Sequence, residues 1–184
     1  MKQWPKTMPS PVSDGQAVLQ EKEETMTYRN ERYTYIHRNY RDPETGLEFV
    51  PNDLDFENLE QVYQQYRERH NIPSPAELRQ MRERYGLSAS KMSDILGLGV
   101  NQYSRYEDGV MPTEAIGKML RSIETPSVFL GYMRDSKSQF SEKEYERLCA
   151  KVQRSFLGFI KSKPDLSWFW DLMSPGAFLN KATL

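Results

Sequence analysis

The 184-residue sequence predicts an α+β protein that is mainly α-helical. Residues 16–50 alternate apolar and polar side chains with a period of two, which is typical of half-buried strands. After residue 50 the apolar side chains recur every three to four residues, and serine, proline and glycine divide the chain into short helices. We therefore expect a small N-terminal antiparallel β meander with a linking helix, a five-helix bundle and a C-terminal helical extension.

Four segments follow from these changes of pattern. Residues 1–15 are rich in proline and lack periodicity, so we expect a flexible arm there. Residues 16–73 should form the meander and the linking helix, a domain that could hold a protein partner. Residues 74–134 should form the helical bundle, and residues 135–184 a third unit at its end.

The meander is predicted from two alternating segments, residues 25–29 and 32–40. Asn30-Glu31 and residues 42–46 have the composition of turns. On the second strand, one face would present Tyr33, Tyr35, His37 and Asn39.

Helix boundaries are marked by capping residues and breakers. Residues 51–71 carry apolar side chains at helical spacing and form the linking helix. Two capping boxes, Ser74 with Glu77 and Ser141 with Glu144, open the bundle and the extension. The five helices of the bundle are expected at residues 75–85, 89–96, 100–108, 113–123 and 127–133.

The second and third of these helices have the order of a helix-turn-helix motif, in which one helix braces another that enters the DNA major groove. The bracing helix is expected at residues 89–96, the turn at 97–99 and the reading helix, which would enter the groove, at 100–108. An inward stripe is expected at Val100, Tyr103 and Tyr106, which leaves the polar residues of this helix facing outward.

The outward-facing polar residues of this helix can form hydrogen bonds with the edges of DNA bases. Asn101 can pair bidentately with adenine and Arg105 with guanine, each pair giving roughly 1 to 3 kcal/mol of discrimination, and Gln102 is a third candidate. Candidate phosphate contacts are Ser104, Lys91, Arg79 and Lys118. Glu107 is expected to pair with Arg82 and brace the helices. Water-facing polar residues on an ordinary amphipathic helix are the alternative interpretation.

The stretch GVNQYSRYEDG (99–109), within residues 76–120, resembles the helix-turn-helix of the MqsA (YgiT-type) antitoxins, a branch of the Xre/Cro-like group. The resemblance implies that Asn101 and Arg105 make the base-specific contacts. It also implies a homodimer on a palindromic operator and autoregulation of a toxin-antitoxin operon. Ala89 stands where many Xre-like domains have a phosphate-binding glutamine.

The N-terminal half departs from this family. Its usual module there is small and β-rich, holds zinc with two pairs of cysteines and binds the cognate toxin. The present chain has a single cysteine, Cys149. Packing of Tyr28, Tyr33, Tyr35 and Phe49 must then replace the metal.

Composition narrows the function further. A formal net charge of -1 limits any DNA surface to a local patch. One cysteine excludes an intramolecular disulfide and fits a reducing cytoplasm, and no signal peptide or membrane span is expected. His37 and His70 fall in different elements, and Cys149 lies on a helical apolar stripe, so we expect no metal, cofactor or catalytic site.

Two hypotheses remain open. In the first, the protein is a repressor that reads DNA. In the second, the bundle only gives stability, and the meander or the aromatic segment at residues 165–179 holds a protein partner. That segment could pack as core or serve in dimerisation.

Overall fold

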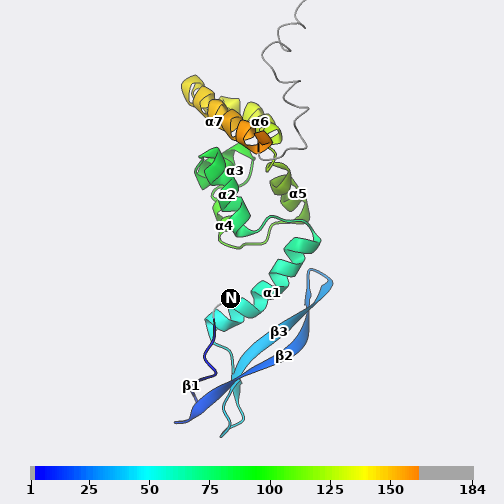
Figure 1. The fold of residues 1–184 in the computed structure, drawn as a ribbon, viewed down its shortest axis with the longest axis vertical. Coiled ribbons are helices and arrows are strands. Elements are labelled where there is room, and N and C mark those ends of the chain that lie inside the picture. The colour runs from blue at the N-terminus through cyan, green and yellow to red at the C-terminus, as the bar shows by residue number, and fades with distance from the viewer. Residues whose placement is uncertain (1–2, 162–184) are drawn as a thin grey trace, which may run out of the picture. The chain divides into compact units, whose positions relative to one another are not determined.

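The computed structural model describes residues 3–161, with side chains up to Ser155, and divides into two units at residue 70 (Figure 1). Each unit is described by itself below. The aromatic segment at residues 165–179 lies outside the described residues. Together the two units confirm the predicted α+β, mainly α class.

The first unit is a four-stranded antiparallel sheet with one helix, in the strand order β1-β2-β3-β4. Its long strands form a hairpin whose two turn residues, Arg29 and Asn30, have φ angles of 49° and 66°. Two positive φ angles give the turn the twist that a two-residue hairpin requires. The elements are β1 (Thr7–Pro9), β2 (Gln16–Tyr28), β3 (Glu31–Arg41), β4 (Glu48–Phe49) and α1 (Asn52–Arg69).

The expected flexible arm is partly a strand instead. β1 pairs with the first residues of β2, and the amide of Leu19 donates to the carbonyl oxygen of Lys6 at 2.9 Å. Trp4 and Met8 pack against the small core of Ala17, Tyr40 and Leu54. Prolines hide the alternating pattern in the sequence, but a proline is tolerated on an edge strand because its missing N–H is not needed there.

Aromatic packing joins the hairpin to α1. The ring of Tyr28 lies edge-on to the ring of Tyr66, with centroids 5.2 Å apart, and Tyr33 also contacts Tyr66. Tyr33 and Tyr35 are buried, as the sequence predicts for residues that fill the core of this unit. The linking helix is thus a packed part of the first unit.

Side-chain amides of α1 also cover the outer edge of β3. Asn58 accepts from the amide of Arg38 at 3.0 Å and donates to the carbonyl of the same residue at 2.8 Å. Gln61 makes the same pair of bonds with Ile36, at 3.1 and 2.9 Å. An uncovered edge would offer these groups to other chains. The helix therefore replaces a neighbouring strand.

Asn58 gives a direct test of this arrangement, because its side chain is only 2% exposed. We expect Asn58→Ala to leave two backbone groups of β3 without a partner and to lower the free energy of unfolding by about 2 kcal/mol. Urea denaturation measures the change. Gln64→Ala is the matched control, since Gln64 is exposed and its side chain bonds Glu68 on the same helix. Equal stability of the two variants would contradict the proposed role of the amides.

The second unit contains six α-helices in the described residues, and the ends of the first follow the capping signals of the sequence. Ser74 makes the expected capping box with Glu77, and Gly86 ends the first helix in the left-handed conformation. The helices are α2 (Pro75–Tyr85), α3 (Ala89–Ile95), α4 (Gln102–Glu107), α5 (Glu114–Ser122), α6 (Pro126–Asp135) and α7 (Glu142–Lys161), with a 3-10 turn at Lys137–Gln139.

The start of the C-terminal extension belongs to the second unit rather than to a third one. Leu148 and Val152 of α7 are buried in the same core as Tyr85 and Phe129. The hydroxyl of Ser155 donates to the carbonyl oxygen of Arg84 at the end of α2, at 3.0 Å. The apolar stripe of α7 was visible in the sequence, but its partner surface was not.

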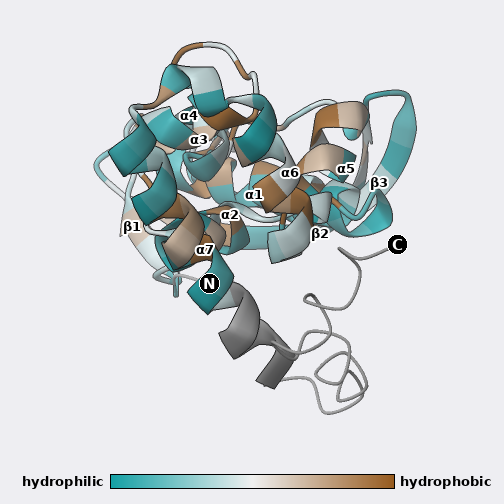
Figure 2. Ribbon diagram, turned by 90° about the horizontal axis from the view of Figure 1, so that it is seen from above, coloured by the Kyte–Doolittle hydropathy of each residue, from teal (hydrophilic) through white to brown (hydrophobic). Residues whose placement is uncertain are grey.

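Hydrophilic and hydrophobic residues mix along the helices in Figure 2. Among the described residues, no helix is both long enough and apolar enough to cross a membrane.

The position of α7 can be tested with Leu148→Ala. Because Leu148 is buried, its truncation should lower the free energy of unfolding of the second unit by about 3 kcal/mol. Arg147→Ala, at the exposed neighbouring position, should change it by less than about 0.5 kcal/mol. Thermal or urea unfolding followed by circular dichroism makes the comparison. An α7 that folds apart from α2 would show no such difference.

Candidate nucleic-acid interface

Two short helices, α3 and α4, are joined by a turn that contains two glycines. Gly97 adopts a φ of 64°, a left-handed conformation that a glycine takes at little cost. The amide of Leu98 then donates back to the carbonyl of Ser93 at 2.9 Å. The turn therefore ends α3 sharply and brings the chain to the start of α4.

The start of α4 differs from the prediction. The expected helix over residues 100–108 is only Gln102–Glu107, and Asn101 precedes it with a φ of 56°. Asparagine enters this left-handed region more readily than most residues. Asn101 and Arg105 are therefore not two positions on one continuous helical face. The first turn still joins them, because the amide of Arg105 donates to the carbonyl of Asn101 at 3.2 Å.

Tyr103 fixes α4 from behind. Its side chain is fully buried, and its hydroxyl donates to the carbonyl of Leu78 on α2 at 2.9 Å. Its amide donates to the hydroxyl oxygen of Ser93 on α3 at 3.0 Å. Burial raises the pKa of Tyr103 far above the ordinary value, so the hydroxyl stays protonated and can donate.

The expected inward stripe is only partly present. Tyr103 and Tyr106 are buried, but Val100 is 89% exposed. Val100 faces outward because it lies in the turn before α4, where helical spacing does not apply. Ser93, a buried polar residue of α3, accepts the hydrogen bond from the amide of Tyr103 at the start of α4. The periodicity of the sequence did not indicate this role.

An ion pair connects the far end of α4 to α2. Nε of Arg82 lies 2.7 Å from Oε1 of Glu107, whose side chain is 7% exposed. The hydrogen bond to Glu107 raises the pKa of the Arg82 guanidinium. Arg79 also reaches this end, where its Nη2 lies 3.5 Å from the carbonyl oxygen of Glu107. Arg82 and Glu107 are the pair that the sequence predicts as a brace.

Of the three candidate base contacts, Asn101 and Gln102 lie at the start of α4, and Arg105 lies in its last turn. Asn101 and Arg105 are exposed, and Gln102 is half-buried. Among the side chains that the structure describes, residues 3–155, none forms a hydrogen bond or ion pair with theirs. Two side-chain amides and one guanidinium are thus available on α4 and at the residue before it, while Tyr103 holds the helix from behind.

The candidate phosphate contacts lie on four different helices, and two of them already have partners within the protein. Lys91 faces the start of α7, because its Nζ lies 3.6 Å from Glu144 on that helix and 4.6 Å from the ring centroid of Phe140, which precedes it. The sequence did not show that α7 packs so close to α3. Arg79 bonds the end of α4, Ser104 is half-buried on α4, and Lys118 is exposed on α5.

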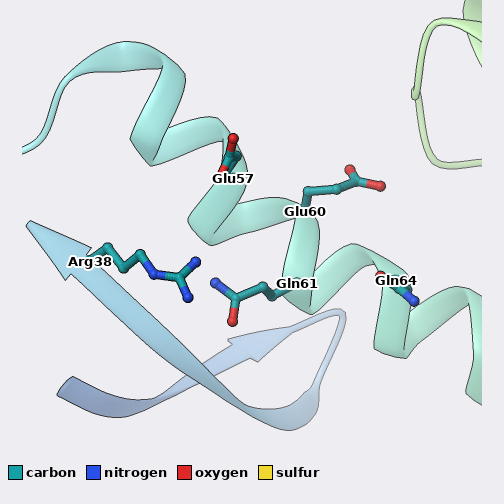
Figure 3. Close-up of a pocket in the computed structure, with 5 residues that line it drawn as sticks. All are labelled: Arg38, Glu57, Glu60, Gln61 and Gln64. Atoms are coloured by element: carbon teal, nitrogen blue, oxygen red, sulfur yellow. The ribbon is translucent and has the colours of Figure 1, made fainter. Parts of the chain in front are cut away.

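A hollow lies in the first unit, between β3 and α1 (Figure 3). It measures about 200 Å³ and is lined by Arg38, Glu57, Glu60, Gln61 and Gln64. Its charged groups already have partners within the unit. Arg38 pairs with Glu21 at 2.7 Å, and Glu57 accepts from the indole of Trp4 at 2.9 Å. This arrangement stabilises the fold and presents no unpaired acid or base.

Comparison with known families gives a match over more than half of the chain. A family model described as the antitoxin component of the bacterial toxin-antitoxin system, MqsA, matches residues 8–134. Neither the curated proteins nor the solved structures that were searched include a match. The family match covers the sheet, α1 and the helices from α2 to near the end of α6.

The brace can be tested by breaking it. Glu107→Ala would leave the guanidinium of Arg82 partly buried without its carboxylate, so we expect the free energy of unfolding to fall by about 3 kcal/mol. Asp108→Ala, at the exposed neighbouring position, should have little effect. Urea denaturation compares the two variants. Similar midpoints would show that the ion pair does not hold α4.

Proposed function

Because the chain belongs to the MqsA family of antitoxin components, we propose that it is a sequence-specific DNA-binding repressor. The observation that supports this proposal best is the state of Asn101, Gln102 and Arg105. Their side chains are accessible and unengaged, whereas the helix that carries them is fixed to α2 and α3. In this reading α3 and α4 form a helix-turn-helix.

The chemistry of these side chains matches the major groove. An asparagine amide can bond N6 and N7 of adenine, and an arginine fork can bond O6 and N7 of guanine. Because α4 is already held in place, less conformational entropy is lost when these bonds form. Asn101 and Arg105 are therefore the proposed readers, with Gln102 beside them.

Binding would require a second copy of the chain. Helix-turn-helix proteins commonly bind palindromic sites as dimers, with reading helices about 34 Å apart. We propose a homodimer on such an operator in the promoter of its own gene, which would give autoregulation. Lys118, Ser104 and Arg79 are the remaining candidates for phosphate contacts. Lys91 would first have to leave Glu144.

The family also implies a toxin as partner. We propose that the first unit holds it, without the zinc that the cysteines of other members would bind. The sheet is stabilised instead by its tyrosine core and by the amides of α1. In this proposal the protein acts in the cytoplasm and has no enzymatic activity of its own.

Substitution of the two readers tests the proposal. In mobility-shift assays with the promoter of its own gene, Asn101→Ala and Arg105→Ala should each weaken binding by roughly 10- to 100-fold. Arg134→Ala removes an exposed arginine from α6 and is the control for net charge. Both reader variants should fold normally, because the wild-type side chains have no partners within the described chain. Unchanged affinity and site preference would refute base reading.

A further inference from the structure

Val100 stands out by its exposure. It is the most exposed large hydrophobic residue in the described part of the chain, at 89%, followed by Phe56 at 60%. It lies directly before Asn101, in the turn that leads into α4. An apolar side chain so fully in water gains nothing for the stability of the fold.

Gly99, its neighbour, has no evident reason to be glycine within the protein. Its φ is not in the left-handed region, unlike that of Gly97. A Cβ at position 99 would meet no atom within 4 Å. By contrast, a Cβ at Gly117 would lie 2.6 Å from Ile72. The space that a side chain at position 99 would fill is therefore solvent on the surface of the protein, not part of its interior.

Resting on the proposed DNA-binding function, we propose that Gly99 and Val100 form an additional DNA contact beside Asn101. Val100 packs against the C5 methyl group of a thymine, which is the apolar feature that base pairs display in the major groove. Gly99 allows the sugar-phosphate backbone to come close to the turn, as glycines do where a ligand approaches the main chain. The operator then carries a thymine next to the base that Asn101 reads.

Replacing thymine by uracil tests the methyl contact, because it removes that methyl group alone. Duplexes of the promoter of the chain's own gene are prepared with each thymine changed in turn to uracil, and their affinities are measured by mobility shift. For the wild-type protein, one position in each half-site should lose about fourfold in affinity, the effect of one buried methyl group. For Val100→Ala, uracil and thymine should bind equally at that position.

Val128→Ala is the matched control, since Val128 is an exposed valine on α6. It should keep the full sensitivity to uracil. If Val100→Ala and the wild-type protein lose the same factor at every position, the methyl contact is refuted, while binding that depends on Asn101 and Arg105 would leave the repressor proposal intact. If the wild-type protein does not bind the promoter specifically, both proposals fail.

Gly99→Ala gives an independent measurement. Because the added methyl group meets nothing in the free protein, stability against urea should be unchanged, whereas DNA affinity should fall about tenfold through steric overlap with the DNA. Gly131→Ala on α6, where a Cβ also meets nothing, should leave DNA affinity unchanged. Normal DNA affinity of Gly99→Ala would overturn the proposed role of this glycine.

Discussion

The anchoring of Tyr103 is the constraint on which the proposed interface depends. α4 has only six residues, and a helix of that length is not stable in isolation. Its position comes from the buried ring of Tyr103, from the bond of its amide to Ser93 and from the bond of its hydroxyl to Leu78. Because these contacts are all made by the back and the beginning of the helix, the side chains in front remain available.

The two units use polar groups in opposite ways. In the first unit the side-chain amides of Asn58 and Gln61 form hydrogen bonds with the backbone of β3. In the second unit the amide of Asn101 has no partner within the described chain. A buried amide must be satisfied internally, whereas an exposed amide without a partner can serve recognition. This contrast separates residues that support the fold from residues proposed to bind DNA.

The sequence predicted most of the architecture because its signals are local. Ser74, Glu77 and Gly86 determine the ends of α2 through short-range hydrogen bonds and backbone conformation, and the structure has α2 at the predicted residues. Alternation likewise located the hairpin. The strand at Thr7–Pro9 was missed because it depends on pairing with β2, which no short-range pattern indicates. The packing of α7 on α2 was missed for the same reason.

The candidate site shows the same division. The identities of Asn101, Gln102 and Arg105 could be selected from their spacing, but their geometry could not. A helical period assumes that the helix continues through residue 100, whereas Asn101 is left-handed and Val100 therefore faces solvent. The orientation of Lys91 toward Glu144 likewise depends on α7, which is distant in the sequence.

Hydrogen exchange of backbone amides, measured with and without DNA from the promoter of the chain's own gene, tests the central claim most directly. The amide of Tyr103 should be protected before DNA is added, because α4 is fixed in the free protein. Added protection on binding should be concentrated in residues 99–105. Rapid exchange at Tyr103 in the free protein, or protection by DNA confined to the first unit, would contradict the account.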